Sequence, residues 1–136
     1  MIINKRGFTL IEILLVVVII GTLAAMVVPR LTGRSRKAKI TVARVDIEAN
    51  VASGLKLYEL DNGTFPTTSQ GLDALARKPT SSPIPNNWNG PYIEKAPLDP
   101  WGKKYQYSYP GSHGYSYDLY SFGPDVNDEG NWIKNW

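Results

Sequence analysis

The sequence predicts an α+β fold in which one long N-terminal helix packs against a small three-stranded antiparallel sheet. Three observations lead to this prediction. An apolar run from Phe8 to Val28 is long enough, as a helix, to cross a bilayer, which takes about 20 residues. Apolar residues then recur at spacings of three and four, as on one face of a helix. Aromatic residues finally alternate with other residues from Tyr105 onwards, as in strands.

The apolar run carries one charge, Glu12, close to its start. A carboxylate in the middle of a bilayer costs roughly 2.5–3.5 kcal/mol on insertion scales, so Glu12 is expected to have a function and a charged partner. If the chain is cut after Gly7, Phe8 gains a free amine. Two such helices packed side by side with an axial stagger would bring Glu12 of one chain beside the amine of the other, which would fix their register.

The segment from Lys5 to Glu12 resembles the class III signal of type IV pilins and pseudopilins. The basic leader, Gly7 before the cut, Phe8 after it and Glu12 all match that signal. The resemblance implies that a prepilin peptidase cleaves after Gly7 and methylates Phe8. The alternative is a secretory signal whose glutamate is incidental, but its apolar region of about 7–15 residues is shorter than this run. The chain then divides into a leader (1–7), a membrane or filament-core helix (8–28) and a C-terminal domain (29–136).

The composition leaves room for one modest domain beside the apolar helix. The 136 residues include 15 Lys and Arg against 12 Asp and Glu. Without Lys5 and Arg6, 13 basic side chains face 12 acidic ones, and this near-neutral balance argues against a general nucleic-acid surface. The sequence has no cysteine, so a device other than a disulfide must hold its C-terminal segment.

Basic residues on the two sides of the apolar run bear on its orientation. Lys5 and Arg6 precede it, whereas five basic residues follow it: Arg30, Arg34, Arg36, Lys37 and Lys39. The positive-inside rule alone would leave the C-terminal domain in the cytoplasm. The resemblance implies the reverse, because prepilin peptidase cleaves at the cytoplasmic side of the membrane. We therefore expect a single-pass protein of the bacterial inner membrane with its C-terminal domain in the periplasm.

After the apolar run the helix is predicted to continue as an amphipathic element. One apolar stripe is expected to face the core of the C-terminal domain: Ala38, Val42, Val45, Ala49, Ala52 and Leu55. Pro29 lacks a backbone donor, so we expect the helix to kink or open between Gly21 and Pro29. Asp61 to Gly63 should end it, with Asn62 or Gly63 in the left-handed conformation.

Turn residues and alternation predict the remaining elements. Thr67 and Gln70 have the spacing of a capping box that opens a short helix through Ala76. The segment from Pro79 to Pro91 is predicted to be an irregular loop. Turns are expected at 99–102 and 110–114. Three strands are expected, one containing Tyr105, Tyr107 and Tyr109, a second containing Tyr115, Tyr117, Leu119 and Phe122, and a third containing Trp132 and Ile133.

The tyrosines and the single histidine suggest two further hypotheses, neither of which we favour. Interleaved aromatics can stack on bases or sugars, but alternating aromatics in strands more often pack a sheet against a helix. His113 lies between glycines without a nearby cysteine or second histidine, so it makes a poor transition-metal site. No nucleophile–base pair is visible, and we expect that the protein is not an enzyme.

The segment from Phe122 to Trp132 holds three carboxylates, those of Asp125, Asp128 and Glu129, with Asn and Gly between them. Such clustered oxygens suit calcium, which takes six to eight oxygen ligands in a tolerant geometry. From the residues alone, a solvated acidic turn is the alternative.

Three motifs, together with the leader, resemble the major pseudopilin family of type II secretion systems: 67–75, 99–102 and 123–125. In that family the C-terminal loop binds calcium. The resemblance implies Asp125 and Asp128 as side-chain ligands, and the carbonyls of Phe122 and Val126 as backbone ligands. The stretch between Asp125 and Gly130 is shorter than is usual in the family, which leaves the ligands after Asp125 open.

The resemblance implies a structural subunit of a periplasmic pseudopilus that drives protein secretion across the outer membrane. Its implied partners are copies of itself, the prepilin peptidase, minor pseudopilins, the inner-membrane assembly platform and membrane lipid, without nucleic acid. One alternative is a type IV pilin for adhesion or motility. Another is a competence pilin, which would bind DNA in a salt-sensitive manner.

Overall fold

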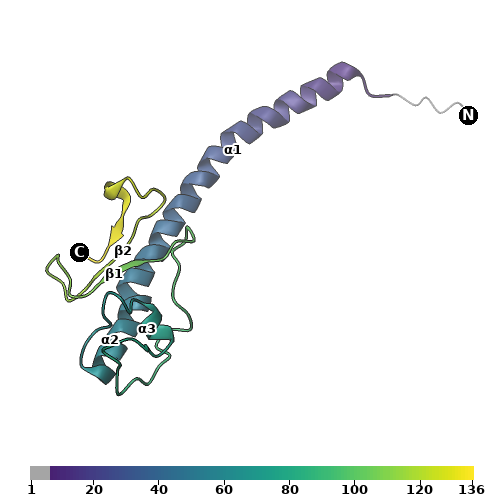
Figure 1. Ribbon diagram of the computed structural model, residues 1–136. Helices are drawn as coiled ribbons and strands as arrows, with labels where there is room; N and C mark the ends of the chain where they lie inside the picture. The colour runs from purple at the N-terminus through teal and green to yellow at the C-terminus, as the bar shows by residue number, and fades with distance from the viewer. Residues whose placement is uncertain (1–6) are drawn as a thin grey trace, which may run out of the picture. The chain divides into compact units, whose positions relative to one another are not determined.

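The computed structural model describes residues 7–136, which fall into two compact units, up to Lys37 and from Ala38 to Trp136. Helix α1 (Leu10–Val45) begins in the first unit and ends in the second (Figure 1). The second unit, called the head below, continues with η1 (Asp46–Asn50), α2 (Val51–Asn62) and α3 (Asp73–Ala76). It ends with β1 (Gln106–Ser108), β2 (Asp118–Ser121), η2 (Glu129–Asn131) and β3 (Ile133–Lys134).

The first part of α1 is apolar and uncovered by the rest of the chain. All side chains from Phe8 to Val28 are exposed. The helical stretch Leu10–Asn62 contains an 18-residue window with a mean hydropathy of 2.8, none of it buried. Among the described residues this is the one stretch long and apolar enough to cross a membrane. Apolar side chains on all sides of a helix require an apolar environment, such as lipid or neighbouring helices.

Helix α1 continues through Pro29, so the expected opening between Gly21 and Pro29 is wrong. Proline removes one backbone donor, but the turns on either side of it keep theirs. Hydroxyl groups also donate to carbonyls of this region, from Thr22 Oγ1 to Ile19 O at 2.8 Å and from Thr32 Oγ1 to Pro29 O at 2.9 Å. Apolar helices tolerate proline through adjustments of this kind.

The irregular turn of the helix lies instead at η1, which is a π-helix. The backbone N–H of Val51 donates to Asp46 O, five residues back, which is the bond that defines this helix type. The Asp46 carboxylate holds the turn in place. It accepts from Asn50 Nδ2 at 2.7 Å and from the Tyr105 hydroxyl, on the sheet side of the head, at 2.8 Å.

The π turn decides which helix face is buried. The core uses residues at regular four-residue spacing, Ala43, Ile47, Val51 and Leu55, each at most 1% exposed. In a regular α-helix four residues advance about 400°, so such a series would drift off one face by about 40° per step. One π turn absorbs an extra residue and cancels much of that drift.

The apolar stripe predicted from the sequence therefore mostly misses the core. Of its six residues only Leu55 is buried, and Ala52 is half-buried. Val42 and Val45 are 51% and 49% exposed, and Ala38 and Ala49 are exposed as well. The prediction assumed an uninterrupted α-helical period, whereas the helix changes period at η1.

The three strands form an antiparallel sheet in the order β1–β2–β3, which confirms the predicted fold class. Tyr107 pairs with Leu119, and Ser121 pairs with Ile133. Leu119 and Ile133 are buried in the same cluster as the helix residues Ile47 and Leu55, so the sheet covers this face of the helix (Figure 1).

The segment between the helix and the sheet follows its local signals. Gly63 ends α2 at φ +77°, and its N–H donates to Glu59 O at 2.7 Å. Thr67 and Gln70 form the predicted capping box: Gln70 N donates to Thr67 Oγ1 at 3.2 Å, and Thr67 N donates to Gln70 Oε1 at 3.1 Å. The helix behind it is shorter than predicted, because Gly71 takes φ +63° and α3 begins only at Asp73.

Candidate functional site

Two regions carry the residues that the sequence singled out: the start of α1 and the loop after β2. At the start of α1, Thr9 and Glu12 form a reciprocal cap. Glu12 N donates to Thr9 Oγ1 at 3.3 Å, and Thr9 N donates to Glu12 Oε2 at 3.4 Å. This is a second capping box, and it satisfies two amides that the first turn of a helix leaves unpaired. In the single chain, Glu12 thus has a local partner within its own backbone.

The residues of the predicted cleavage junction are open to solvent. Phe8 is 80% exposed, and a side chain added at Gly7 would meet no atom within 4 Å. Gly7, Phe8, Thr9 and Glu12 line one open concavity. An extended, uncovered segment before the helix can enter the active site of a peptidase. The basic residues Lys5 and Arg6 lie outside the described residues.

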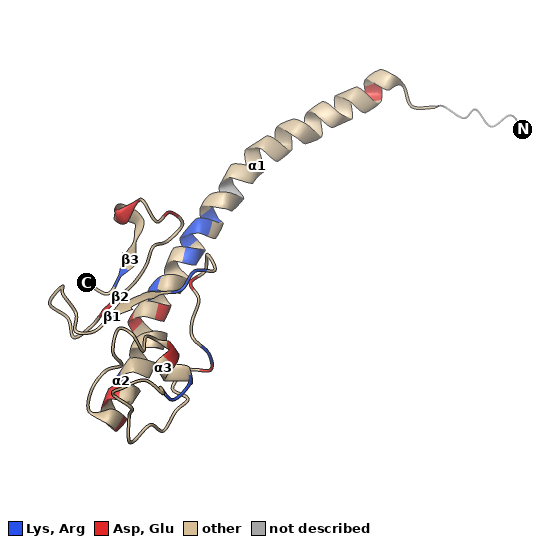
Figure 2. Ribbon diagram, in the orientation of Figure 1, with Lys and Arg blue, Asp and Glu red and all other residues tan. Residues whose placement is uncertain are grey.

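Charge is distributed unevenly along α1. Figure 2 shows one acidic position in the first turns, a long uncharged stretch, and then a band of Lys and Arg. The acidic position is Glu12, and the described basic residues of the band include Arg34, Arg36, Lys37 and Lys39. An uncharged stretch followed by a basic band is typical of a helix whose apolar part ends at a lipid head-group region.

The loop from Phe122 to Trp132, called the C-terminal loop below, connects β2 to β3. Near its start lies Gly123, where φ is +67° and an added Cβ would lie 2.8 Å from Asn131 O. Only glycine fits this close approach, and it brings the two ends of the loop together. Residues 124–130 between them are all exposed.

The structure places the four predicted calcium ligands, Phe122, Asp125, Val126 and Asp128, in this one loop. Asp125 Oδ1 accepts from Asn127 N at 2.9 Å, and Asp128 Oδ2 accepts from the side-chain amide of Asn131. Each carboxylate therefore uses one oxygen for the loop itself. No group of three or more Asp, Glu, His or Cys residues gathers within residues 7–136, so Glu129 does not join the two aspartates.

The donors that the loop offers are oxygens alone, which is the kind of ligand that calcium prefers. Each aspartate keeps its second oxygen free of hydrogen bonds within the described part of the chain. A Cβ at Gly130 would lie 3.3 Å from Asp128 Oδ1, so glycine leaves this oxygen uncovered. A calcium ion bound by these two carboxylates would take its remaining ligands from backbone carbonyls and water, which calcium accepts.

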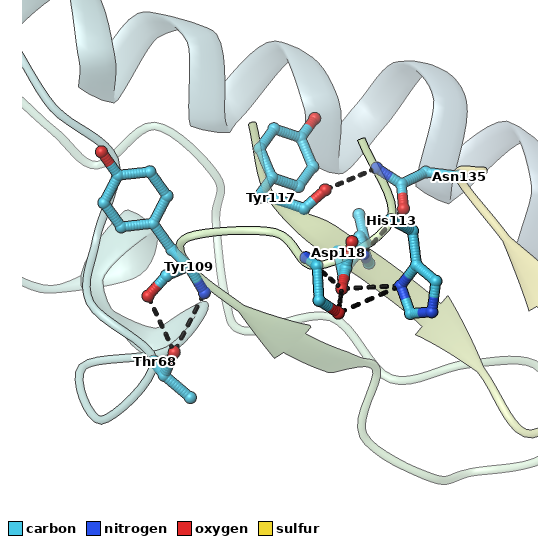
Figure 3. Close-up of polar contacts among 8 residues, drawn as sticks. Thr68, Tyr109, His113, Tyr117, Asp118 and Asn135 are labelled. Atoms are coloured by element: carbon cyan, nitrogen blue, oxygen red, sulfur yellow. Dashed lines mark hydrogen bonds and ion pairs between the residues drawn. The ribbon is translucent and has the colours of Figure 1, made fainter. Parts of the chain in front are cut away.

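A second set of contacts fixes the C-terminus without a disulfide. The Asn135 side chain accepts from Leu119 N at 2.9 Å and donates to Tyr117 O at 3.0 Å, so it pairs with the backbone of β2 like a further strand residue (Figure 3). Trp136 stacks on His113 with ring centroids 4.0 Å apart. The sequence carried no local signal for either contact, because both join residues far apart in the chain.

The buried carboxylate of Asp118 contacts the ring of His113. This carboxylate is 2% exposed and accepts from the backbone and hydroxyl of Ser112 at 2.9 and 2.8 Å, and it lies 2.9 Å from His113 Nδ1 (Figure 3). Burial by itself would raise the pKa of Asp118, but the hydrogen bonds from Ser112 and the interaction with His113 outweigh it. The pKa of Asp118 is therefore lowered.

Thr9 and Trp132 are two residues at these sites whose contacts were not predicted. The Thr9–Glu12 cap has the readable pattern of Thr followed three residues later by Glu. Trp132 was assigned only to a strand, although its indole Nε1 donates to Val126 O in the C-terminal loop at 3.2 Å. No sequence pattern specifies that bond.

Comparison with known proteins covers both regions. A family model of type II secretion system protein G matches residues 30–136, and a model of the prokaryotic N-terminal methylation motif matches residues 2–28. Type II secretion system core protein G of Pseudomonas aeruginosa is 54% identical over 138 residues, covering 98% of this chain and 96% of the relative. The protein of the same description from Escherichia coli K12 is 48% identical over 138 residues, covering 98% and 92%.

A solved structure agrees with the sequence relatives. The crystal structure of the major pseudopilin from the type 2 secretion system of enterohaemorrhagic Escherichia coli matches with a TM-score of 0.69 and 42% identity. The match covers 78% of this chain and 89% of that one. These matches decide against a type IV pilin. With a long, uncovered apolar helix and a three-stranded head, the chain belongs to the protein G family of type II secretion systems, and it is a pseudopilin.

Proposed function

We propose that this chain is the major subunit of a periplasmic pseudopilus and that it acts by assembly rather than by catalysis. The observation that carries the proposal is the start of α1, where an open Gly7–Phe8 junction precedes Glu12 and an apolar helix without cover. The relatives named above are components of type II secretion systems, which supports a filament that helps to move proteins across the outer membrane.

Before assembly the helix holds the subunit in the inner membrane. Residues 8–28 span the bilayer once, and the basic band of α1 lies at the periplasmic head-group region. A prepilin peptidase cuts after Gly7 and methylates Phe8. Minor pseudopilins and the inner-membrane assembly platform are the further partners that a growing filament requires.

In the filament, Glu12 exchanges its local partner for one in another subunit. The carboxylate caps its own helix through Thr9 in the single chain. After cleavage, the amine of Phe8 in a neighbouring chain offers a full positive charge in an apolar surrounding, where an ion pair is much stronger than in water. The stagger that brings the two groups together sets the register of the filament.

The head binds calcium at the C-terminal loop. Asp125 and Asp128 supply the charged ligands, and the carbonyls of Phe122 and Val126 supply backbone ligands. When bound, the ion neutralises the two carboxylates and links them. Since the chain has no disulfide, this link adds to the contacts of Asn135 and Trp136 in holding the C-terminal segment.

Processing is tested with Gly7→Val in cells that depend on this chain for secretion. The variant should accumulate as the full precursor in the inner membrane and should not support secretion, because the peptidase requires a residue without a bulky side chain at this position. Mass spectrometry of the wild-type chain should find a mature N-terminus at methylated Phe8. A mature form that retains Met1, or one cut within 24–26, would contradict the proposal.

The role of Glu12 is tested with two variants that separate its charge from its cap. Glu12→Gln keeps a capping side chain but loses the charge, whereas Thr9→Ala loses the hydroxyl that accepts from Glu12 N and keeps the charge. If the charge sets the register, Glu12→Gln should be cleaved and inserted but should form few pseudopili, while Thr9→Ala should assemble nearly normally. Normal pseudopili from Glu12→Gln, counted by electron microscopy, would refute an intersubunit ion pair.

A further inference from the structure

Aromatic residues at both ends of the C-terminal loop pack against Tyr120 of the sheet. The ring of Trp132, at the end of the loop, lies nearly parallel to that of Tyr120 in β2, with centroids 5.4 Å apart and an interplanar angle of 13°. It also meets Phe122, at the start of the loop, edge-on at 4.9 Å. The Lys134 amine lies 5.5 Å from the centre of the indole ring. These contacts fix the plane of the indole against β2 and β3.

From this fixed position the indole reaches the middle of the loop. Its Nε1 donates to Val126 O at 3.2 Å. The Trp132 backbone N–H donates to Glu129 O at 3.3 Å, so one residue holds two points of the exposed segment. Among the described residues, Trp132 is the one whose side chain donates a hydrogen bond to Val126 O.

We propose that Trp132 is a positioning residue for calcium, which presets the Val126 carbonyl as a ligand. This inference rests on the proposed calcium site. A carbonyl oxygen has two lone pairs, so one can accept the indole N–H while the other remains for the ion. An exposed loop that is held in one arrangement binds better, because its apparent Kd rises as the binding-competent fraction falls.

Trp132→Phe tests the inference, since it keeps an aromatic ring beside Tyr120 and removes the N–H. Trp136→Phe is the matched control. Trp136 belongs to the same aromatic group, 5.5 Å from Tyr120 and with the Lys134 amine 5.4 Å from its ring centre. Its indole makes no hydrogen bond to the C-terminal loop among the described residues.

The full chain, purified in detergent and stripped with a chelator, is titrated with calcium in a calorimeter. Trp132→Phe should raise the Kd for calcium about two- to tenfold, the range expected for one lost hydrogen bond. The Trp132→Phe variant should also show a smaller calcium-induced increase in melting temperature than the wild type. Trp136→Phe should leave the Kd unchanged, and any change in melting temperature that it causes through its contacts with His113 and Tyr120 should be the same with and without calcium.

The outcomes separate this inference from the proposed function. If the wild type binds calcium and Trp132→Phe binds it equally well, the positioning role is overturned while the calcium site stands. If both tryptophan variants raise the Kd alike, the effect comes from packing of the aromatic group and the inference is again overturned. If the wild type does not bind calcium, the site and the role of Trp132 are overturned together.

Discussion

The head contains two turns with aspartate residues, and these turns differ in how their carboxylates are satisfied. The turn from Asp99 to Lys103 holds a carboxylate that is 4% exposed. Its Oδ1 accepts from Trp101 N and Lys103 N at 3.0 and 2.8 Å, and its Oδ2 accepts from Ser121 Oγ at 2.7 Å. The C-terminal loop, by contrast, holds Asp125 and Asp128 in solvent with one oxygen of each unused. A carboxylate whose oxygens are all bonded within the chain serves the fold, whereas an exposed pair with unused oxygens is suited to a ligand from outside.

The two turns are also connected. Ser121, at the end of β2, donates to Asp99 and accepts from Gly123 N at 3.0 Å. The turn from Asp99 to Lys103 thereby supports the start of the C-terminal loop. Substitution of Asp99 should lower stability with or without calcium, whereas substitution of Asp125 or Asp128 in the C-terminal loop should matter only when calcium is present.

The largest effect is expected for Asp99→Ala. It leaves two backbone N–H groups and the Ser121 hydroxyl without their acceptor, which should lower the free energy of unfolding by about 3 kcal/mol. The loss should be the same in calcium and in chelator, as measured by thermal unfolding of the full chain in detergent. Asp73→Ala, at an exposed position of α3, is the control and should change little. A loss seen only in calcium would make Asp99 part of the ion site.

A smaller effect, dependent on pH rather than on calcium, is expected for Asp118→Asn. The lowered pKa of Asp118 means that its charged form stabilises the fold. This contribution is complete above the ordinary pKa of about 3.9 and is lost as the pH falls through the lower folded-state value. The variant should therefore be less stable than wild type by about 2 kcal/mol at pH 7, and the difference should narrow below pH 4. Urea unfolding across this range measures it, and a difference that stays constant with pH would contradict the assignment.

The smallest effect is expected for Asp125→Ala. In millimolar calcium it should lower the free energy of unfolding by about 1 kcal/mol, the gain expected for an extracellular site with a Kd of about 10⁻⁴–10⁻³ M. In EGTA the variant and the wild type should unfold at nearly the same temperature. Limited proteolysis should cut the C-terminal segment faster in the variant only when calcium is present. A wild-type melting temperature that is equal in calcium and EGTA would show that the loop is only an acidic turn.

Local signals in the sequence predicted much of this fold. The Thr67–Gln70 capping box, the left-handed Gly63 and the three strands depend on neighbouring residues, and each is present. The buried face of the helix was predicted wrongly, because a change of helical period at η1 leaves no simple mark among the apolar residues. The four-residue series from Ala43 to Leu55 becomes recognisable only once the π turn is known.

The start of α1 could be predicted from the residues themselves more fully than the C-terminal loop. Glu12 was found because a charge in an apolar run is costly, and its neighbour Thr9 could have been found from the capping pattern. The four residues assigned to calcium came from the resemblance to a family, and they lie in one loop. The contacts of Trp132 and Asn135 join distant parts of the chain, so no local pattern could have shown them.

The π turn lets the helix carry one residue more than a regular α-helix needs between its buried positions. Removing one residue from Asp46–Asn50 would leave 11 residues from Ala43 to Leu55, which advance about 1,100° in a regular α-helix, within about 20° of three full turns. Leu55 and Tyr58 would thus stay on the buried face. Inserting one residue after the π turn would instead rotate everything after it by about 100° and turn exposed residues such as Lys56 toward the core. A single deletion within these five residues should therefore be tolerated far better than a single insertion after them, with Ile47 and Asp46 as the exceptions because of their burial and hydrogen bonds.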